Sequence, residues 1–271
     1  SSMYYDSAKQ YTYCNYCQCY RSNRTKSNFR WFSRAIRGDL GVSIRQTIPV
    51  KTLIFERLGA TIELAVVSVI IAILLGIPLG LFASTRRGTL WDYLTMIVSL
   101  IGVSMPGFWL GLVLLSYVAL NVSWLPMFGR DASIMGGLWT LVTQFRADEL
   151  INSFRYLLLP AVALGTSMMA IIARLTRSSM LEVLSKDFIR TAQAKGLKKS
   201  VVVIKHALRN ALMPVITMVG IQFGAMLGGA VVTETVFAWP GVGRLVINAI
   251  TQRDFPLVQG GVLMMALIFT L

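Results

Sequence analysis

The side chains that most often carry catalysis or bind metals are few in this sequence and form no complete active-site pattern. There is one histidine, His206, and there is no G-x-x-x-x-G-K-[ST], HExxH or GxSxG pattern. Cys14, Cys17 and Cys19 form a CxxCxC cluster that could bind a metal or form disulfides, but no second ligand pair follows and three is an odd number. We favour a polar tail with incidental thiols. We therefore predict a chain that is not an enzyme and holds no metal or cofactor of its own.

Carboxylates that could couple transport to an ion gradient are also scarce. Ionisable side chains inside membrane spans are functional candidates by default. Here Glu63 and Glu234 lie near the ends of apolar segments, where we expect solvated carboxylates at the membrane interface. Uphill transport by this protein would therefore draw its energy from a partner.

The composition identifies a membrane protein. The 271 residues are 55% hydrophobic and only 14% charged, with a mean hydropathy of +0.63, whereas about a quarter of the residues in soluble domains are charged. Segments 93–120 and 210–233 contain no Asp, Glu, Lys or Arg. At about 1.5 Å per residue, each is long enough to cross a hydrocarbon core of about 30 Å. We predict an all-α polytopic membrane protein.

The chain divides into a polar tail, 1–29, an extracytoplasmic lead-in, 30–59, and a transmembrane domain, 60–271. The five predicted spans are 60–84, 93–120, 156–174, 210–233 and 255–271.

Helix-breaking residues fall inside two of these spans. Gly76, Pro78 and Gly80 interrupt the first span. Pro106 removes a backbone hydrogen bond in the second and should kink or split that helix. The candidate residues for a transport pathway are Met105, Pro106 and Gln222.

The distribution of basic residues predicts the orientation. Segments 85–92 and 174–209 carry 2 and 9 Lys/Arg, whereas 121–155 and 233–255 carry 3 and 2. The positive-inside rule places the first pair in the cytoplasm. Residues 1–60 carry 10 Lys/Arg and oppose this orientation, but most lie too far from the first span to count strongly. Topology thus accounts for the basic excess, and no aromatic-basic platform or zinc-finger spacing indicates nucleic-acid binding.

Gly220, Gly224 and Gly228 recur every four residues and so share one face of the fourth span. Small residues at this spacing let helices approach closely in lipid. We favour packing within the chain over a subunit interface or a pathway wall.

The cytoplasmic loop 174–209 contains the most informative segment. The order DFIRTAQAKG, residues 187–196, predicts a short helix closed by a glycine. Phe188, Thr191, Ala192 and Lys195 fall near one face of that helix. A small apolar face with a basic edge suits insertion into a cleft of a partner protein. A solvated loop would explain the charges but not the small residues.

This segment resembles the EAA loop of permease subunits in binding-protein-dependent ABC importers, whose pattern is EAA, three residues and then Gly. Arg190, Thr191 and Ala192 occupy the EAA positions and Gly196 the glycine. Arg190 replaces the acidic residue, and RTAQAKG followed by HALRNA is similar to the dipeptide, oligopeptide and nickel branch of that family. The further matches are GDLGVSI (38–44), RSSMLEVL (177–184) and TETVFAWPGVGRL (233–245), so the resemblance covers about residues 30–271.

The resemblance implies the transmembrane domain of a type I ABC importer in the bacterial inner membrane, with the family's first span not legible in residues 1–29. The implied partners, besides membrane lipid, are a second homologous permease subunit, two ATPase subunits or domains that bind ATP and Mg, and an extracytoplasmic solute-binding protein. The implied coupling residues are Asp187, Arg190, Thr191, Ala192, Lys195, Gly196 and Leu197. The implied function is ATP-driven import of di- or oligopeptides; nickel or glutathione import, or a secondary transporter, are the alternatives.

Overall fold

The computed structural model describes residues 38–122, 124–131, 133–134, 136–137 and 148–270, so the predicted tail and its three cysteines lie outside the described residues. Within the described ranges the regular secondary structure is helical, apart from one isolated β-bridge between Val42 and Pro49. The prediction of an all-α protein is confirmed.

Twelve helical segments are described in chain order. They are α2 (Val50–Thr85), α3 (Leu90–Ser104), α4 (Gly107–Val113), the π-helical η1 (Leu114–Ala119), α6 (Asp148–Leu184), α7 (Asp187–Ala194), α8 (Lys199–Val201), the π-helical η2 (Val202–Leu208), α9 (Arg209–Gly229), α10 (Val231–Val236), α11 (Val242–Thr251) and α12 (Phe255–Thr270).

Three helical segments in the described part of the chain are long and apolar enough to cross a membrane: Val50–Thr85, Asp148–Leu184 and Lys199–Gly228. The bent pair of α3 with α4–η1 adds a fourth if it counts as one span, and α12 is a shorter apolar helix of 16 residues. Helices α2 and α6 extend well beyond the spans predicted at 60–84 and 156–174. A hydropathy window detects only the apolar centre of a helix, whereas polar residues at its ends remain helical.

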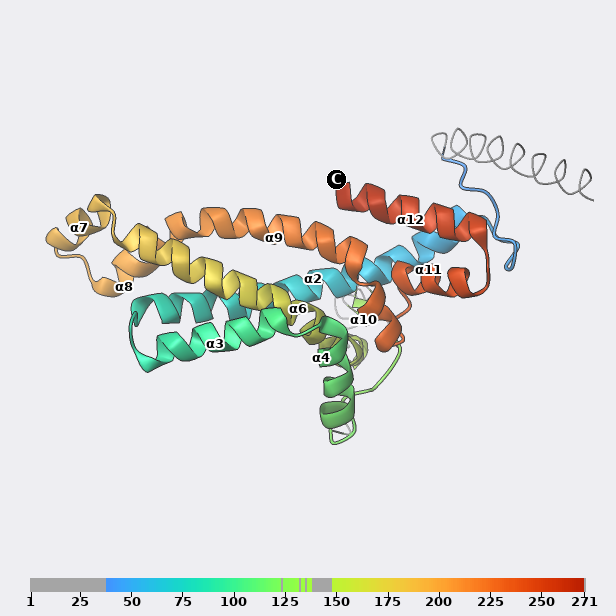
Figure 1. The fold of residues 1–271 in the computed structure, drawn as a ribbon, viewed down its shortest axis with the longest axis horizontal. Coiled ribbons are helices and arrows are strands. Elements are labelled where there is room, and N and C mark those ends of the chain that lie inside the picture. Colours follow the sequence, from blue (N-terminus) through green and yellow to red (C-terminus); the bar gives the residue numbers. More distant parts are fainter. Residues whose placement is uncertain (1–37, 123, 132, 135, 138–147, 271) are drawn as a thin grey trace, which may run out of the picture.

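The helical break predicted at Pro106 is confirmed. Met105 and Pro106 have extended backbone geometry, and the helices on either side are bent by 101°. As a result α4 projects sideways from the long bundle (Figure 1). In contrast, Pro78 lies inside the continuous helix α2, so the predicted interruption of the first span is wrong.

Close packing of α2 against α6 forms the centre of the bundle, and glycines make it possible. A Cβ atom added at Gly76 would lie 2.9 Å from the carbonyl oxygen of Met169, and one added at Gly165 would lie 2.8 Å from that of Ser68. A Cβ atom at Gly80 would overlap the Ala173 carbonyl. Gly76 and Gly80 therefore serve close helix contact, as small residues do in lipid, and are not helix breaks.

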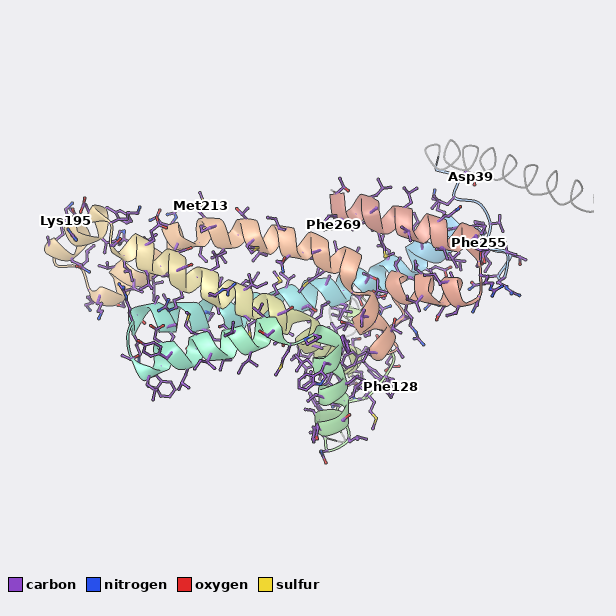
Figure 2. All side chains as sticks on the ribbon, in the orientation of Figure 1. Asp39, Phe128, Lys195, Met213, Phe255 and Phe269 are labelled. Atoms are coloured by element: carbon purple, nitrogen blue, oxygen red, sulfur yellow. The ribbon has the colours of Figure 1, made fainter. Side chains whose placement is uncertain are left out.

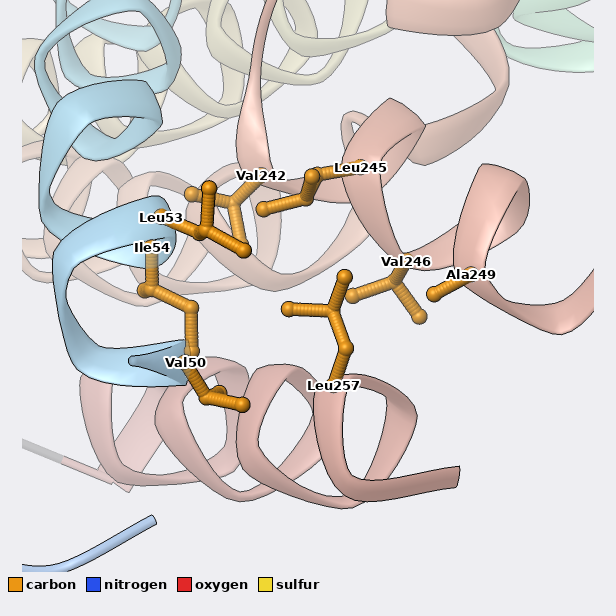
Figure 3. Close-up of a cluster of buried hydrophobic side chains, with 8 residues drawn as sticks. All are labelled: Val50, Leu53, Ile54, Val242, Leu245, Val246, Ala249 and Leu257. Carbon is orange, nitrogen blue, oxygen red and sulfur yellow. The ribbon is translucent and has the colours of Figure 1, made fainter. Parts of the chain in front are cut away.

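The two ends of the bundle contain different elements. Figure 1 shows α7 at one end of the long axis, and α11 with the start of α12 near the other. At the α11 end, side chains from α2, α11 and α12 form the buried cluster drawn in Figure 3. This cluster joins the beginning of the described chain to its last two helices.

Candidate functional site

The short helix α7 forms where the sequence predicts it. Asp187 lies in the first turn, where a carboxylate complements the positive end of the helix dipole. The helix ends at Ala194, and Gly196 follows with φ +77°, a left-handed conformation that favours glycine. The N–H of Gly196 donates to the carbonyl of Gln193 at 2.9 Å and completes the turn. The glycine thus closes the helix and turns the chain back towards α8.

The neighbouring helices pack against α7 through a shared apolar cluster. The predicted loop 174–209 is almost entirely helical. Helix α6 continues to Leu184, α7 follows, and the helical segment after α7 begins at Lys199. Ile189 of α7 is 1% exposed. It belongs to a buried apolar cluster with Met180, Ala192, Val202, Ala207 and Ala211. Helix α7 is thus packed against α6, η2 and α9.

The structure divides the predicted coupling residues between two faces of α7. Ala192 is 9% exposed and packs inward in that apolar cluster, so its small size serves packing within the chain. The remaining coupling residues, Asp187, Arg190, Thr191, Lys195, Gly196 and Leu197, are exposed. Phe188 beside them is 45% exposed although it is a large apolar side chain. Figure 2 shows Lys195 at the tip of this end of the bundle.

The charges around α7 are only weakly tied to one another. Arg190 lies 3.6 Å from Asp187, and both side chains are more than three-quarters exposed. Water and salt screen exposed pairs of this kind, so they contribute little to stability. Arg190, which stands where the EAA pattern has an acidic residue, therefore remains available to a partner.

Sequence reasoning missed an ion pair that links α3 to α6 near this end. Asp92 is 2% exposed. It accepts hydrogen bonds from Arg177 Nε at 2.5 Å and Arg177 Nη2 at 2.8 Å, and one from the N–H of Gly88 at 3.1 Å. Such a bidentate pair fixes both the distance and the orientation of its partners. A signal was present, because Asp92 is the one acidic residue at the start of an otherwise uncharged span.

The glycines of α9 are not closely packed within this chain. A Cβ atom at Gly220 would have no described atom within 4 Å. At Gly224 and Gly228 it would make ordinary contacts with Phe269 of α12, at 3.6 and 3.8 Å. Gly224 and Gly228 thus pack at ordinary distances against α12, whereas Gly220 is open in the described chain. The neighbouring side chains Met213, Ile216 and Ile221 are 60–72% exposed.

The three candidate pathway residues do not meet in one cavity. Met105 and Pro106 line an open apolar groove of about 480 Å³ at the bend between α3 and α4. Gln222 lies on α9 and does not contribute to that groove. Ser104 contributes a hydroxyl to the lining of the groove, and the other lining side chains, including Phe108 and Trp109, are largely apolar.

At the opposite end, Glu234 is buried, and the prediction of a solvated carboxylate is wrong. Its side chain is 0% exposed. The Thr61 hydroxyl donates to Oε1 at 2.7 Å, and the N–H of Arg244 donates to Oε2 at 3.0 Å. The same Thr61 oxygen accepts the N–H of Val242 at 2.9 Å, and the Trp239 indole N–H donates to the carbonyl of Ala60 at 2.8 Å. These bonds fasten α10 and α11 to α2.

Glu63 is also paired and is not a freely solvated carboxylate. Its Oε2 lies 2.6 Å from Arg130 Nη2, and both side chains are less than one-fifth exposed. The Arg130 guanidinium also lies 5.7 Å from the centre of the Trp239 ring. The ion pair therefore adds to the contacts that hold the segment around Trp239 against α2.

A further buried carboxylate, Asp254, holds the beginning of the described chain. It is 1% exposed and accepts hydrogen bonds from the Ser43 hydroxyl and from the N–H groups of Ile44 and Arg45, the latter two at 3.3 and 3.4 Å. Burial alone would raise the pKa of Asp254, but the hydrogen bonds from Ser43, Ile44, Arg45 and Leu257 outweigh it and hold the pKa below the ordinary aspartate value.

The described residues contain no group of three or more His, Cys, Asp or Glu placed to hold a metal ion. His206 lies in η2, half-buried. The described residues thus combine a short helix with one exposed face, a packed helical bundle and hydrogen-bonded buried carboxylates.

Residues 76–271 match the family described as "Binding-protein-dependent transport system inner membrane component". A dipeptide transport system permease protein of Alkalihalophilus pseudofirmus is 49% identical over 243 residues, which cover 86% of this chain and 72% of that protein. The dipeptide transport system permease protein of Escherichia coli K12 is 44% identical over 239 residues, covering 84% and 70%. Among solved structures, an inward-facing methionine ABC transporter matches with a TM-score of 0.58 and 19% identity, covering 80% of this chain and 92% of that chain.

Proposed function

Because the chain belongs to the family of inner membrane components of binding-protein-dependent transport systems, we propose that it is the permease subunit through which an ABC importer moves di- and oligopeptides across the bacterial inner membrane. The single observation that carries the peptide assignment is the 44–49% identity to dipeptide permeases over most of the chain. These relatives favour peptides over nickel or glutathione as cargo.

The structure supports a mechanical role in this transport. Partner ATPases would bind ATP and Mg, dock on the exposed face of α7, and draw that helix inward as they close. The docking residues in this proposal are Asp187, Phe188, Arg190, Thr191, Lys195, Gly196 and Leu197. Since α7 shares a buried cluster with α6 and η2, its displacement would tilt α6 and α9 as rigid helices. Such tilting is a known way to open a pathway alternately to the two sides of a membrane.

The exposed face of α9 is the proposed contact with a second, homologous permease subunit. Met213, Ile216 and Ile221 are strongly exposed there, and Gly220 has open space beside it. Small residues next to exposed apolar ones allow a partner helix to approach closely in lipid. The α9 glycines would therefore serve an interface or a pathway wall between two subunits.

A secondary transporter is the weaker alternative. Coupling to an ion gradient needs an ionisable group that can bind and release its ion near the membrane centre. The buried Glu234 is the strongest candidate in the described chain, but its two oxygens already accept hydrogen bonds from Thr61 and Arg244. That bonding suits a structural anchor.

The experiment that tests the transport function is complementation. The permease and its partners are expressed in a bacterium that lacks its own peptide importers and needs an amino acid supplied only as a dipeptide. Growth is expected with the dipeptide. Absence of growth and of labelled dipeptide uptake, with the subunits present in the membrane, would refute peptide import; nickel and glutathione uptake are measured in parallel.

The role of α7 is tested by Phe188→Glu, which places a charge on its exposed edge. We expect loss of ATPase subunits on purification of the complex and loss of uptake. Phe255→Glu makes the same change at an exposed position at the other end of the bundle and should leave ATPase binding unchanged. Wild-type ATPase binding by the Phe188→Glu variant would show that α7 is not the docking helix.

The orientation is tested by thiol labelling in a chain whose native cysteines are replaced. A cysteine at Ser200, beside α7, should not react with a membrane-impermeant reagent added to intact cells. A cysteine at the exposed Gln252, at the opposite end, should react. Labelling of Ser200→Cys from outside would contradict a cytoplasmic α7.

A further inference from the structure

A polar cavity of about 260 Å³ lies at the end of the bundle opposite α7. Its polar side chains are those of Gln46, Arg57, Arg244, Asn248 and Gln252. The lining thus has two guanidinium groups and three amides, and no carboxylate. The lining residues Leu245, Ala249 and Leu257 belong to the buried cluster shown in Figure 3.

The cavity has more hydrogen-bond donors than its own chain satisfies. Arg57 is exposed and makes no hydrogen bond or ion pair with any described residue. Arg244 uses its Nη1 to donate to the carbonyl of Ala238, which leaves its other guanidinium N–H groups without a partner in the described chain. A guanidinium carries five N–H donors and no acceptor. The lining therefore suits a negatively charged ligand with acceptor oxygens.

Two buried carboxylates hold the walls of the cavity without lining it. Glu234 accepts the backbone N–H of Arg244 and so fixes the start of α11. Asp254 accepts hydrogen bonds from the 43–45 segment, beside Gln46. In addition, Arg45 Nε donates to the carbonyl of Gln252 at 3.2 Å. A site whose walls are already ordered loses less conformational entropy when a ligand binds.

We propose that this cavity binds the free carboxylate end of a short peptide on its way into the importer. The inference rests on the proposed function, which supplies the peptide and places this end of the bundle outside the cytoplasm. A carboxylate matches the planar fork of a guanidinium and can accept two parallel hydrogen bonds from it. The amides of Asn248 and Gln252 can bond the peptide group that follows.

The size of the cavity favours a small peptide over a single acidic side chain of a docked protein. Pockets for drug-sized ligands have volumes of about 300–1,000 Å³, and 260 Å³ lies just below that range. One carboxylate side chain would leave much of this space unfilled. A dipeptide offers both the charge and the volume that the cavity accommodates.

The test measures peptide binding to the complete membrane complex in lipid nanodiscs, without the solute-binding protein. The probes are radiolabelled Ala-Phe and the same dipeptide with an amidated C-terminus. Arg57→Gln and amidation should each raise the Kd about tenfold or more, because each removes a charge-assisted pair, and Arg57→Lys should restore part of the affinity. Lys51→Gln is the matched control: it removes one exposed positive charge from the same helix, outside the cavity.

Two results would overturn this site. Equal Kd values for Arg57→Gln and Lys51→Gln, or for the free and amidated dipeptide, would show that the cavity does not bind the carboxylate. No peptide binding to the wild-type complex, together with weaker docking of peptide-free solute-binding protein to Arg57→Gln alone, would assign the cavity to an acidic side chain of that protein. ATP-driven peptide uptake by the wild-type complex distinguishes failure of the cavity assignment from failure of the proposed transport function. Uptake would still be measured if only the cavity assignment were wrong.

Discussion

Helix α7 and the opposite end of the bundle are held by different kinds of interaction. At the α7 end, Ile189 and Ala192 pack in an apolar cluster, and the ion pairs on α7 are exposed. At the opposite end, Glu234 and Asp254 are buried and accept hydrogen bonds from hydroxyl and backbone N–H groups. Apolar contact is non-directional, whereas hydrogen bonds require fixed distances and angles.

This difference suits a molecule that receives force at one end and holds its shape at the other. A helix seated on apolar side chains can shift by small amounts without losing a specific bond. A segment held by buried carboxylates cannot, because each unmade hydrogen bond in a dry environment costs the full desolvation of its donor. We therefore expect α7 to be the more tolerant of movement.

The largest effect is expected from Glu234→Ala. The substitution leaves the Thr61 hydroxyl and the N–H of Arg244 buried without their acceptor, so the free energy of unfolding should fall by about 3 kcal/mol. Thermal or denaturant unfolding of the purified chain in detergent measures it. Glu56→Ala, at an exposed position on α2, is the control. Equal unfolding midpoints for Glu234→Ala and Glu56→Ala would contradict the view that buried hydrogen bonds to Glu234 stabilise this part of the bundle.

Ala192→Glu should have the next largest effect, and it should be local. A carboxylate at this buried position would face the cluster around Ile189 and Met180, at a cost of about 2 kcal/mol. We expect α7 to detach, so that hydrogen exchange of its amides accelerates and ATP hydrolysis is uncoupled from uptake. Thr191→Glu adds the same charge to the neighbouring exposed position. Similar exchange rates in both variants would place Ala192 on the outer face.

Lowering the pH should loosen the Asp254 end selectively. The pKa of Asp254 is depressed in the folded chain, so the unfolded chain binds the proton more readily. The ionised Asp254 carboxylate therefore stabilises the folded chain at pH values above the ordinary aspartate pKa of about 3.9. This stabilisation is lost as the pH falls through the folded-state pKa. We expect the wild type to lose stability as the pH falls below the ordinary aspartate pKa of about 3.9, and we expect this loss to be absent from Asp254→Asn. Parallel pH profiles of the melting temperature would contradict this assignment.

The smallest effect is expected from Arg190→Gln. The ion pair with Asp187 is exposed to water on both sides, so the melting temperature should not change measurably. ATPase binding should weaken nonetheless if Arg190 faces the partner. A clear drop in the melting temperature would indicate that the α7 end depends on charge as well as on apolar packing.

Features that depend on near neighbours in the chain could be predicted from the sequence. The break at Pro106 follows from one missing hydrogen bond and a fixed φ angle. The short helix before Gly196 follows from a glycine that accepts a positive φ. The membrane spans follow from apolar length alone, although their polar ends were underestimated.

Features that depend on which helix faces which could not be predicted. Gly76 and Gly80 looked like helix breaks, but they allow α2 to touch α6. Gly220, Gly224 and Gly228 looked like the packing face, but they meet little within the chain. The two sets have the same local chemistry.

The sequence by itself determined that this chain is a helical membrane protein of the binding-protein-dependent importer family, because hydropathy and motif spacing are properties of short stretches. Only the tertiary structure decided which small and charged residues meet. Glu234 was expected in water and is bonded to Thr61, 173 positions earlier in the chain, and Asp92 meets Arg177 across 85 positions. Burial and pairing of such groups depend on how helices distant in the sequence pack together. The residues beside each group in the sequence do not determine that packing.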